Sequence, residues 1–371
     1  MNEIVYFDAA ASFLKPESVI QNQADFLRNR YANAGRGVCA RATAVDEMVA
    51  KSRMRVARFI NADESQIVWT ANATDGLNRI VNIIARNYNM TDFSVAVSNL
   101  EHHSARLPWQ DALSSKKIKQ IFVYDLDDVF NIKIDSIPKT DILVITAMSN
   151  VLGVPQDVGA IIRVARLKNP NVITIVDATQ YVVHKKIDVA DWDCDFLVFS
   201  GHKIGADTGV GVLYIKDSQK YMTDKFGGGM VLRVANDESV ILQGAPEKFE
   251  AGTLPLTQIS GLAVAIDELE KSRPDLNLIK YMYDELKKIS RIKILSSRDA
   301  AVLSFVVDGM HVLDFGTLVG ANGICLRVGN MCASWIHHAM NIDGSVRVSV
   351  GPWNTLADAD KFISVVRKII K

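Results

Sequence analysis

The sequence contains few cysteines and no excess of either charge. Its four cysteines, Cys39, Cys194, Cys325 and Cys332, have neither CxxC nor zinc-finger spacing. This argues against a structural metal site and against a disulfide framework. Lys plus Arg and Asp plus Glu both number 42, so no bulk basic charge favours nucleic acid or an anionic membrane surface. These absences favour reduced thiols and a small neutral or zwitterionic ligand.

A membrane span and a secretory signal are also missing from the pattern. No apolar stretch approaches the roughly 20 residues of a membrane span. The strand-like run at 4–7 (IVYF) directly follows Met1-Asn2-Glu3, without the basic region and apolar core of a signal peptide. We therefore expect a cytoplasmic protein. With 371 residues, 49% hydrophobic and 23% charged, the chain is long enough for one large globular domain and a smaller one.

Short apolar runs alternate with helix-like stretches from residue 65 to about 216. The predicted strands, rich in Val, Ile and Phe, are 66–70, 94–98, 120–124, 142–146, 172–176, 196–199 and 210–215. Nearly continuous apolar runs are typical of strands buried on both faces, and the intervening lengths allow crossover helices. The pattern predicts an α/β fold with a mostly parallel seven-stranded sheet.

The pattern changes after Gly227-Gly228-Gly229. Apolar residues at helical spacing over 259–269 predict a helix that Arg273-Pro274 ends. The elements expected after it are a helix at 276–289, strands near 291–295 and 301–307, a helix near 311–320, strands near 324–328 and 345–350, and a final helix after Asn354-Thr355. We expect a large domain over 17–265 and a smaller α+β domain over 266–371. Segment 1–16 is expected to pack near the small domain and the active site.

Polar side chains follow predicted strands where open α/β sheets bind ligands. The segments are 70–74 (TANAT), 101–103 (EHH), 177–180 (DATQ) and 200–203 (SGHK). Pyridoxal 5′-phosphate (PLP) needs a lysine amine for a Schiff base, a carboxylate for its pyridine nitrogen and donors for its phosphate. These segments supply them, in that order, as Lys203, Asp177, and the group Thr74, Ser200 and His202.

Two more residues of these segments suit the same cofactor. His102 offers an aromatic face for the pyridine ring, and Gln180 a hydrogen bond to the phenolic oxygen. Each residue also has an ordinary structural explanation, since a lysine after a strand is usually a solvated charge and an aspartate there is often a helix N-cap. Their joint occurrence in this order favours the PLP hypothesis.

The same motifs resemble those of one enzyme family. The run 177–180 (DATQ), His184, 193–203 (DCDFLVFSGHK) and 208–214 (TGVGVLY) is similar to the cofactor-lysine region of class V, fold-type I PLP enzymes. More narrowly, it resembles group II cysteine desulfurases and selenocysteine lyases. Further matching segments are 8–12 with Lys15-Pro16, 36–38, 59–61, 101–104 with 108–110, 149–153, 249–253 and 327–333. The resemblance covers essentially the whole chain in order.

The resemblance implies a fold-type I PLP-dependent transferase and a role for each matching position. Lys203 would be the Schiff-base lysine, and the other cofactor-binding residues would be Asp177, Gln180, His102, Thr74, Ala73, Ser200, His202 and Asn150. Thr253 would reach the phosphate of a neighbouring subunit, which implies a homodimer with shared sites. Arg347 matches the arginine that clamps the substrate carboxylate through a planar fork, with Asn150 and Arg327 also at the substrate.

Cys332 matches the persulfide-forming cysteine and would be catalytic together with Lys203 and His102. It lies in 329–335 (GNMCASW), a loop-like stretch between two predicted strands. A thiol must ionise to attack, whereas a free cysteine is otherwise a small buried hydrophobe. The implied reaction converts L-cysteine to L-alanine, with sulfur passing to Cys332 and then to an acceptor protein. Selenocysteine lyase activity is a related expectation.

Several positions differ from the pattern of this branch. Asn330-Met331 stand in place of His-His, Cys39 in place of His, Met230-Val231 in place of Glu-Met, and 204–207 (IGAD) in place of Leu-Tyr-Gly-Pro. Because these changes lie near the substrate, two alternatives stay open. One is another class V PLP lyase, epimerase or aminotransferase with Cys332 a bystander. The other is a non-catalytic scaffold or sulfur-relay subunit, against which the near-complete cofactor set argues.

Overall fold

A seven-stranded sheet forms the centre of the molecule. The computed structural model describes residues 4–35, 37–236 and 239–370, so Met1-Asn2-Glu3 and Arg36 of the matching 36–38 segment lie outside the described residues. The strands are β2 (Ile67–Thr70), β3 (Ser94–Val97), β4 (Gln120–Val123), β5 (Ile142–Thr146), β6 (Ile173–Asp177), β7 (Phe196–Ser200) and β8 (Gly211–Ile215). Their order is β2-β8-β7-β6-β5-β3-β4, and only the pairs made by β8 are antiparallel. The prediction of a mostly parallel seven-stranded sheet is confirmed.

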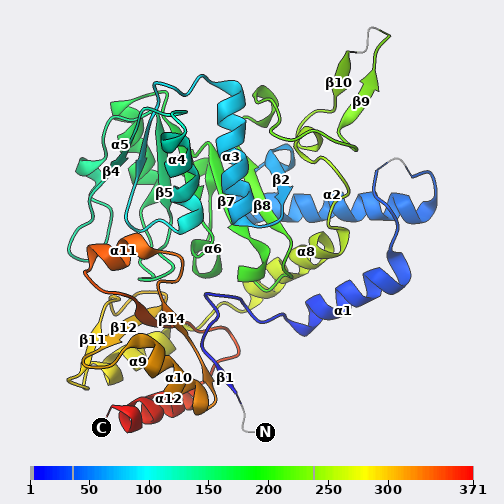
Figure 1. Cartoon of the computed structure of the whole chain (residues 1–371). Helices are drawn as coiled ribbons and strands as arrows, with labels where there is room; N and C mark the ends of the chain where they lie inside the picture. The colour runs from blue at the N-terminus through cyan, green and yellow to red at the C-terminus, as the bar shows by residue number, and fades with distance from the viewer. Residues whose placement is uncertain (1–3, 36, 237–238, 371) are drawn as a thin grey trace.

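Helices cover both faces of this sheet (Figure 1). α3 (Ala73–Asn87) and α4 (His103–Ser114) pack on one face, and α2 (Ala40–Ile60), α5 (Val158–Lys168) and α8 (Leu256–Lys271) pack on the other. In β7, Leu197 and Phe199 belong to one core while Phe196 and Val198 belong to the other. Burial on both faces explains why the central strands are continuously apolar.

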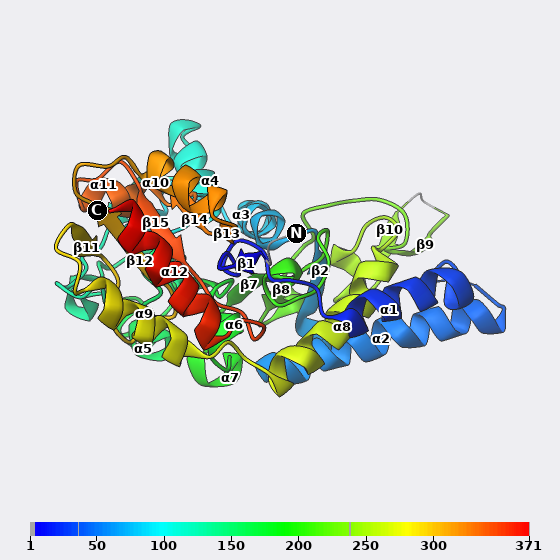
Figure 2. The same cartoon turned by 90° about the horizontal axis from the view of Figure 1, so that it is seen from below.

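The connections around the sheet vary in length. α1 (Glu17–Asp25) lies alongside α8, and the π-helical turn Phe26–Arg30 that continues it contacts α2 (Figure 2). Only short helices, α6 (Tyr181–His184) and α7 (Val189–Trp192), join β6 to β7. Within the described residues, the connection from β4 to β5 holds only the 3-10 turn Ile134–Ser136, so no crossover helix forms there.

The C-terminal part forms a separate four-stranded antiparallel sheet. Its order is β11 (Ile292–Ile294), β12 (Leu303–Val307), β15 (Ser345–Val348) and β14 (Arg327–Gly329). α9 (Leu276–Leu286), α10 (Val312–Ala321) and α12 (Leu356–Ile369) bury their apolar faces with it in a core of its own. Val5 and Phe7 join this core, because β1 (Val5–Tyr6) pairs with β13 (Ile324–Cys325).

Three local features differ from the sequence predictions. The single strand expected at 324–328 is wrong, since β13 pairs with β1 whereas β14 pairs with β15. α11 (Ser334–Ala339) begins inside the stretch expected to be a loop. The hairpin of β9 (Val231–Val234) and β10 (Val240–Leu242), which was not predicted, extends from the body of the molecule (Figure 1).

The boundary between the two predicted domains stays a prediction. The division at 265/266 falls within α8, whose Leu269 still packs in the core of the large sheet. Leu278, in α9, is the next core residue that packs with the C-terminal sheet. In the described ranges, no helix is both long and apolar enough to cross a membrane.

Candidate active site

The sheet brings the polar segments together at one edge. β2 and β7 both pair antiparallel with β8 and therefore run in the same direction, so their carboxyl ends lie with those of β3, β5 and β6. A cavity of about 360 Å³ opens at this edge. Its lining includes Ala73, Thr74, His102, Asn150, Asp177, Gln180, Ser200, His202, Lys203, Arg327, Cys332 and Arg347. Every site residue predicted from the sequence except Thr253 is in this set.

Lys203 ends the 3-10 turn that follows β7. Its Nζ donates to the carbonyl oxygens of Ala10 at 2.7 Å and Ala11 at 2.9 Å. Gln180 Nε2 also donates to the Ala10 oxygen, at 2.8 Å. Burial, and secondarily the positive charge of Arg347, lower the pKa of Lys203 to about 8. A lysine with this pKa has a large fraction of neutral, nucleophilic amine at mildly alkaline pH.

Asp177 is the last residue of β6, and its side chain is buried. Its Oδ1 accepts a hydrogen bond of 3.0 Å from the Thr179 N–H. The helix that follows begins at Tyr181 with Gln180 at its N-cap, so Asp177 is not the cap of that helix. The negative charge of Asp177 favours the protonated forms of both His102 and Lys203, which shows that the three groups share one electrostatic environment.

His102 is the N-cap residue of α4. Its Nδ1 accepts from the Ser104 N–H at 3.2 Å and lies 2.7 Å from Ser104 Oγ. Burial lowers the pKa of His102, which favours a neutral ring at pH 7. The ring is therefore held at the cavity wall in the form that can stack on an aromatic ligand or accept a proton.

The start of α3 lines one end of the cavity. Thr74 lies in the first turn of this 15-residue helix, and Ser200 Oγ accepts from the Ala73 N–H at 2.8 Å. A Cβ at Gly211 would lie 2.6 Å from Asn72 Cα, so glycine lets β8 approach the helix start closely. Burial lowers the pKa of His202 to about 4. Asn72 Oδ1 and the Asn72 carbonyl accept from the N–H groups of Asp75 and Gly76, so the Thr74 N–H and the hydroxyls of Thr74 and Ser200 are the donors at this helix start that suit a phosphate.

Two arginines of the C-terminal sheet meet one carboxylate of the N-terminal segment. Asp8 accepts from Arg347 Nη2 at 3.2 Å and from Arg327 Nη2 at 2.7 Å. Arg347 Nη1 donates to the Asn150 carbonyl at 2.8 Å. Burial lowers the pKa of Arg347 to about 10, so it stays cationic at neutral pH, and its buried Nε has no partner among the described residues. The Nε of this guanidinium can donate a hydrogen bond to an anionic group.

Glu101 is a buried supporting residue that had no predicted role. Its carboxylate accepts from Ser98 Oγ at 2.9 Å and from the Thr146 N–H at 3.2 Å. Burial raises the pKa of Glu101 to about 7. The hydrogen bonds join the ends of β3 and β5, which places His102 beside the cavity. The acidic residue before His102 was visible in the sequence, but its hydrogen-bond partners were not.

Cys332 is exposed, and it lines the cavity together with Met331. It also lines an adjacent groove of about 520 Å³ that runs along α3 and α4. The thiol can therefore meet molecules from two sides.

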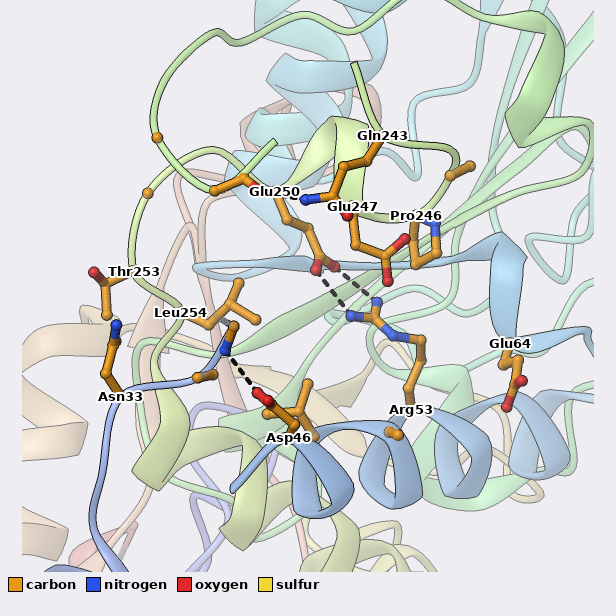
Figure 3. Close-up of a pocket in the computed structure, with 18 of the residues that line it drawn as sticks. Asn33, Asp46, Arg53, Glu64, Gln243, Pro246, Glu247, Glu250, Thr253 and Leu254 are labelled. Carbon is orange, nitrogen blue, oxygen red and sulfur yellow. Dashed lines mark hydrogen bonds and ion pairs between the residues drawn. The ribbon is translucent and has the colours of Figure 1, made fainter. Parts of the chain in front are cut away.

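Thr253 lies outside the cavity that contains Lys203. It lines a separate pocket of about 730 Å³, together with Gly228 and Gly229 of the glycine-rich segment. Figure 3 shows this pocket with the ion pair between Arg53 and Glu250, whose paired atoms are 2.8 Å apart. Within one chain, the structure does not bring Thr253 to the other predicted site residues.

The fold and this cavity define the class of protein. A family model described as "Aminotransferase class-V" matches residues 5–362. The chain therefore belongs to the class-V aminotransferase family.

The relatives narrow this class to one branch. The chain is 32% identical to a probable cysteine desulfurase of Vibrio cholerae over 100% of this chain and 94% of that protein. It is 30% identical to a cysteine desulfurase of Escherichia coli, over 99% of this chain and 93% of that protein. The apo structure of a cysteine desulfurase from Thermococcus onnurineus is similar with a TM-score of 0.93 and 30% identity, covering 100% and 95% of the two chains. The structure of the S-sulfonic acid form of the Escherichia coli cysteine desulfurase CsdA is similar with a TM-score of 0.89 and 31% identity. The match covers 98% of this chain and 94% of that chain.

Proposed function

We propose that this chain is a PLP-dependent cysteine desulfurase that converts L-cysteine to L-alanine and takes the sulfur onto Cys332. The observation that carries the proposal is the single cavity shared by Lys203, Asp177, Arg347 and Cys332. The full-length similarity to cysteine desulfurases supports the same reaction. These residues form a site for an amino acid that has a carboxylate at one end and sulfur at the other.

The residues of the cavity fit PLP. Lys203 has a lowered pKa, Asp177 offers a buried carboxylate, and the start of α3 offers the N–H and hydroxyl of Thr74. In the part of the chain that the structure describes, Thr179 Oγ1 and Arg347 Nε are buried without partners. Buried polar groups usually have hydrogen-bond partners, and both residues line the cavity, so these two atoms fit a site for a polar ligand. When bound, PLP supplies an electron sink for the bonds at the substrate α-carbon.

The residues around the substrate divide the remaining work. Arg347 would hold the substrate carboxylate through its Nε edge, and Asn150 would lie beside it. This clamp fixes the α-carbon relative to Lys203. The neutral amine of Lys203 would move a proton at the α-carbon, with the neutral ring of His102 as a second acceptor.

The sulfur step balances without an added oxidant or reductant. Cys332 Sγ attacks as a thiolate, so that a sulfur–sulfur bond forms while the carbon–sulfur bond of the substrate breaks. The bonding electron pair stays with the substrate carbon, which takes up a proton to give alanine. Cysteine plus the enzyme thiol thus yields alanine plus the enzyme persulfide. An acceptor protein with a reactive thiol would then remove the sulfur.

One assay separates this proposal from its alternatives. Purified protein reconstituted with PLP is given L-cysteine, and alanine and sulfide are measured in the presence of a reductant. A desulfurase forms both, and L-serine, which lacks sulfur, is the matched negative control. Another class V enzyme forms neither product but retains the yellow cofactor band. A scaffold shows no turnover, and either of these last two results would contradict the proposal.

We also infer a homodimer in which Thr253 completes the site of the partner subunit. The support is its position in a pocket apart from its own chain's Lys203. Shared sites predict complementation when two inactive variants are mixed. A Thr253→Ala subunit paired with a Lys203→Ala subunit has one site with both native residues, so the mixture regains activity. Activity no higher than the sum of the separate variants would contradict a shared site.

A further inference from the structure

The backbone at Cys332 has a conformation that needs support from its surroundings. Met331 has φ of 49° and Cys332 has φ of 55°, so two successive non-glycine residues are left-handed. Non-glycine residues in this conformation are strained and persist only where neighbouring structure holds them. The loop that carries the thiol would therefore relax if its external contacts were lost.

Two contacts from other parts of the chain hold these two residues. The His103 N–H donates to the Cys332 carbonyl at 2.7 Å. Asn150 Nδ2 donates to the Met331 carbonyl at 2.8 Å. Each left-handed residue thus has its carbonyl fixed by a residue from another part of the chain. The first contact uses backbone atoms only and does not depend on the His103 side chain.

The side chain of His103 holds the other end of the loop. The Ser334 N–H, at the start of α11, donates to His103 Nε2 at 3.0 Å, and Ser334 Oγ lies 3.1 Å from the same nitrogen. Ala333, the N-cap residue of α11, has no side-chain oxygen to accept this hydrogen bond. His103 therefore acts as the capping acceptor from a different helix. Because Nε2 accepts, the neutral ring carries its proton on Nδ1.

An aromatic contact reinforces this attachment. The His103 ring meets Trp335 edge-on, with centroids 5.1 Å apart and an interplanar angle of 81°. The guanidinium of Arg106, one turn further along α4, lies 4.4 Å from the Trp335 ring centroid. Cys332, Ser334 and Trp335 thus all contact residues of α4.

We propose that His103 is a positioning residue that holds the loop of Cys332 so that the thiol faces the substrate. This inference rests on the proposed desulfurase function and adds a role for a residue that does not line the cavity around Lys203. Cys332 borders both the cavity and the groove along α3 and α4, so small shifts of the loop would move the thiol from one to the other. Asn330-Met331 precede the cysteine in this chain. The contacts that restrain the loop come instead from α4, which lies outside it.

The test compares His103→Ala with His103→Gln in the PLP-loaded protein. Glutamine offers an oxygen near the position of Nε2, whereas alanine offers none. Ser114→Ala, an exposed change on the same helix at a residue that does not line the groove, is the matched control. The measurements are amide hydrogen exchange of the peptide covering 329–336, kcat and KM for alanine formation from L-cysteine, and the visible spectrum.

In His103→Ala we expect the amide exchange rate of 329–336 to rise about tenfold, as for the loss of one hydrogen bond. We expect kcat to fall by about the same factor. KM and the spectrum should stay as in wild type, because PLP and the substrate carboxylate are held elsewhere. His103→Gln should recover most of both effects. Unchanged exchange in His103→Ala would overturn the attachment, and unchanged kcat would overturn its role in catalysis. An equal loss of kcat in His103→Ala and His103→Gln, together with an altered visible spectrum, would also overturn the proposal. His103 would then act on the cofactor site.

These results are distinguishable from failure of the proposed function. If the wild type forms no alanine, the desulfurase proposal fails by itself, while hydrogen exchange still reports whether His103 holds the loop.

Discussion

Lys203 Nζ lies 2.7 Å from the carbonyl oxygen of Ala10, a residue 193 positions earlier in the chain. The same oxygen accepts from Gln180, and Asp8 in the same segment binds Arg347 and Arg327. The N-terminal segment therefore contacts residues from the sheet edge and from the C-terminal sheet at once. Ala10 and Ala11 of this segment line the cavity together with Lys203 and Arg347.

Replacement of the lysine tests the cofactor assignment. Lys203→Ala should lose the yellow absorbance of the covalently held cofactor, because no other lysine lines the cavity among the described residues. PLP should then be removed by dialysis, since only non-covalent contacts remain. The visible spectrum before and after dialysis checks this. A wild-type spectrum that survives dialysis would show that another amine holds the cofactor.

The lowered pKa of Lys203 predicts how cofactor loading depends on pH. Only the neutral amine reacts with the aldehyde of PLP, and burial followed by the charge of Arg347 lowers the pKa of this amine to about 8. The loading rate of cofactor-free protein should rise with pH and level off above about 8. Arg347→Met removes one lowering charge and should move the midpoint to higher pH. Stopped-flow absorbance measures the loading rate of the wild type and of Arg347→Met as a function of pH. If both rates still rise in parallel above about pH 9, the lowered pKa of Lys203 is contradicted.

The sequence was sufficient to predict the sheet and the edge that carries the site. Continuous apolar runs mark strands covered on both faces, and parallel strands necessarily bring their carboxyl ends together. Asp177, Ser200 and Lys203 could therefore be placed near one another from the order of the strands and the residues that follow them. The family resemblance extended the same set to Arg347 and Cys332.

Contacts between distant segments could not be predicted in this way. Asp8 was visible in a matching motif, but its partner Arg347 lies 339 positions away, and no local pattern connects them. The strand expected at 324–328 divides because its first part pairs with β1, at the other end of the chain. The partners of Glu101 and the attachment of His103 to Ser334 likewise depend on packing between elements.

The buried carboxyl group of Glu101 predicts a pH-dependent stability difference. Its pKa is raised from 4.5 to about 7, so the folded state binds the proton more tightly than the unfolded state does. The stabilisation from protonated Glu101 is complete below pH 4.5 and is lost as pH rises through 7. A shift of this size corresponds to at most about 3 kcal/mol.

Glu101→Gln removes this titration. Urea denaturation gives the free energy of unfolding of the wild type and of the variant at each pH. The wild-type value minus the variant value should decrease as the pH is raised from about 4.5 to about 7.5. Taking the difference cancels the titration of all other groups. A difference that stays flat or rises over this range would show that Glu101 is ionised in the folded protein at acidic pH.

Cys332→Ser examines the sulfur step without disturbing the cofactor. The cofactor spectrum and substrate binding should persist, because PLP and the carboxylate are held by other residues. In the wild type after reaction with L-cysteine, one added sulfur should be found by mass spectrometry on the peptide with Cys332, rather than on Cys39, Cys194 or Cys325. Selenocysteine is a useful control, since its weaker carbon–selenium bond permits turnover without the thiol.

The rate of alanine release from L-cysteine by Cys332→Ser is the most direct test of the proposed function. A serine hydroxyl is a far poorer nucleophile toward sulfur at neutral pH, so the rate should fall on the order of 100-fold or more relative to wild type. Alanine release at the wild-type rate would contradict the account and would show that Cys332 takes no part in breaking the carbon–sulfur bond.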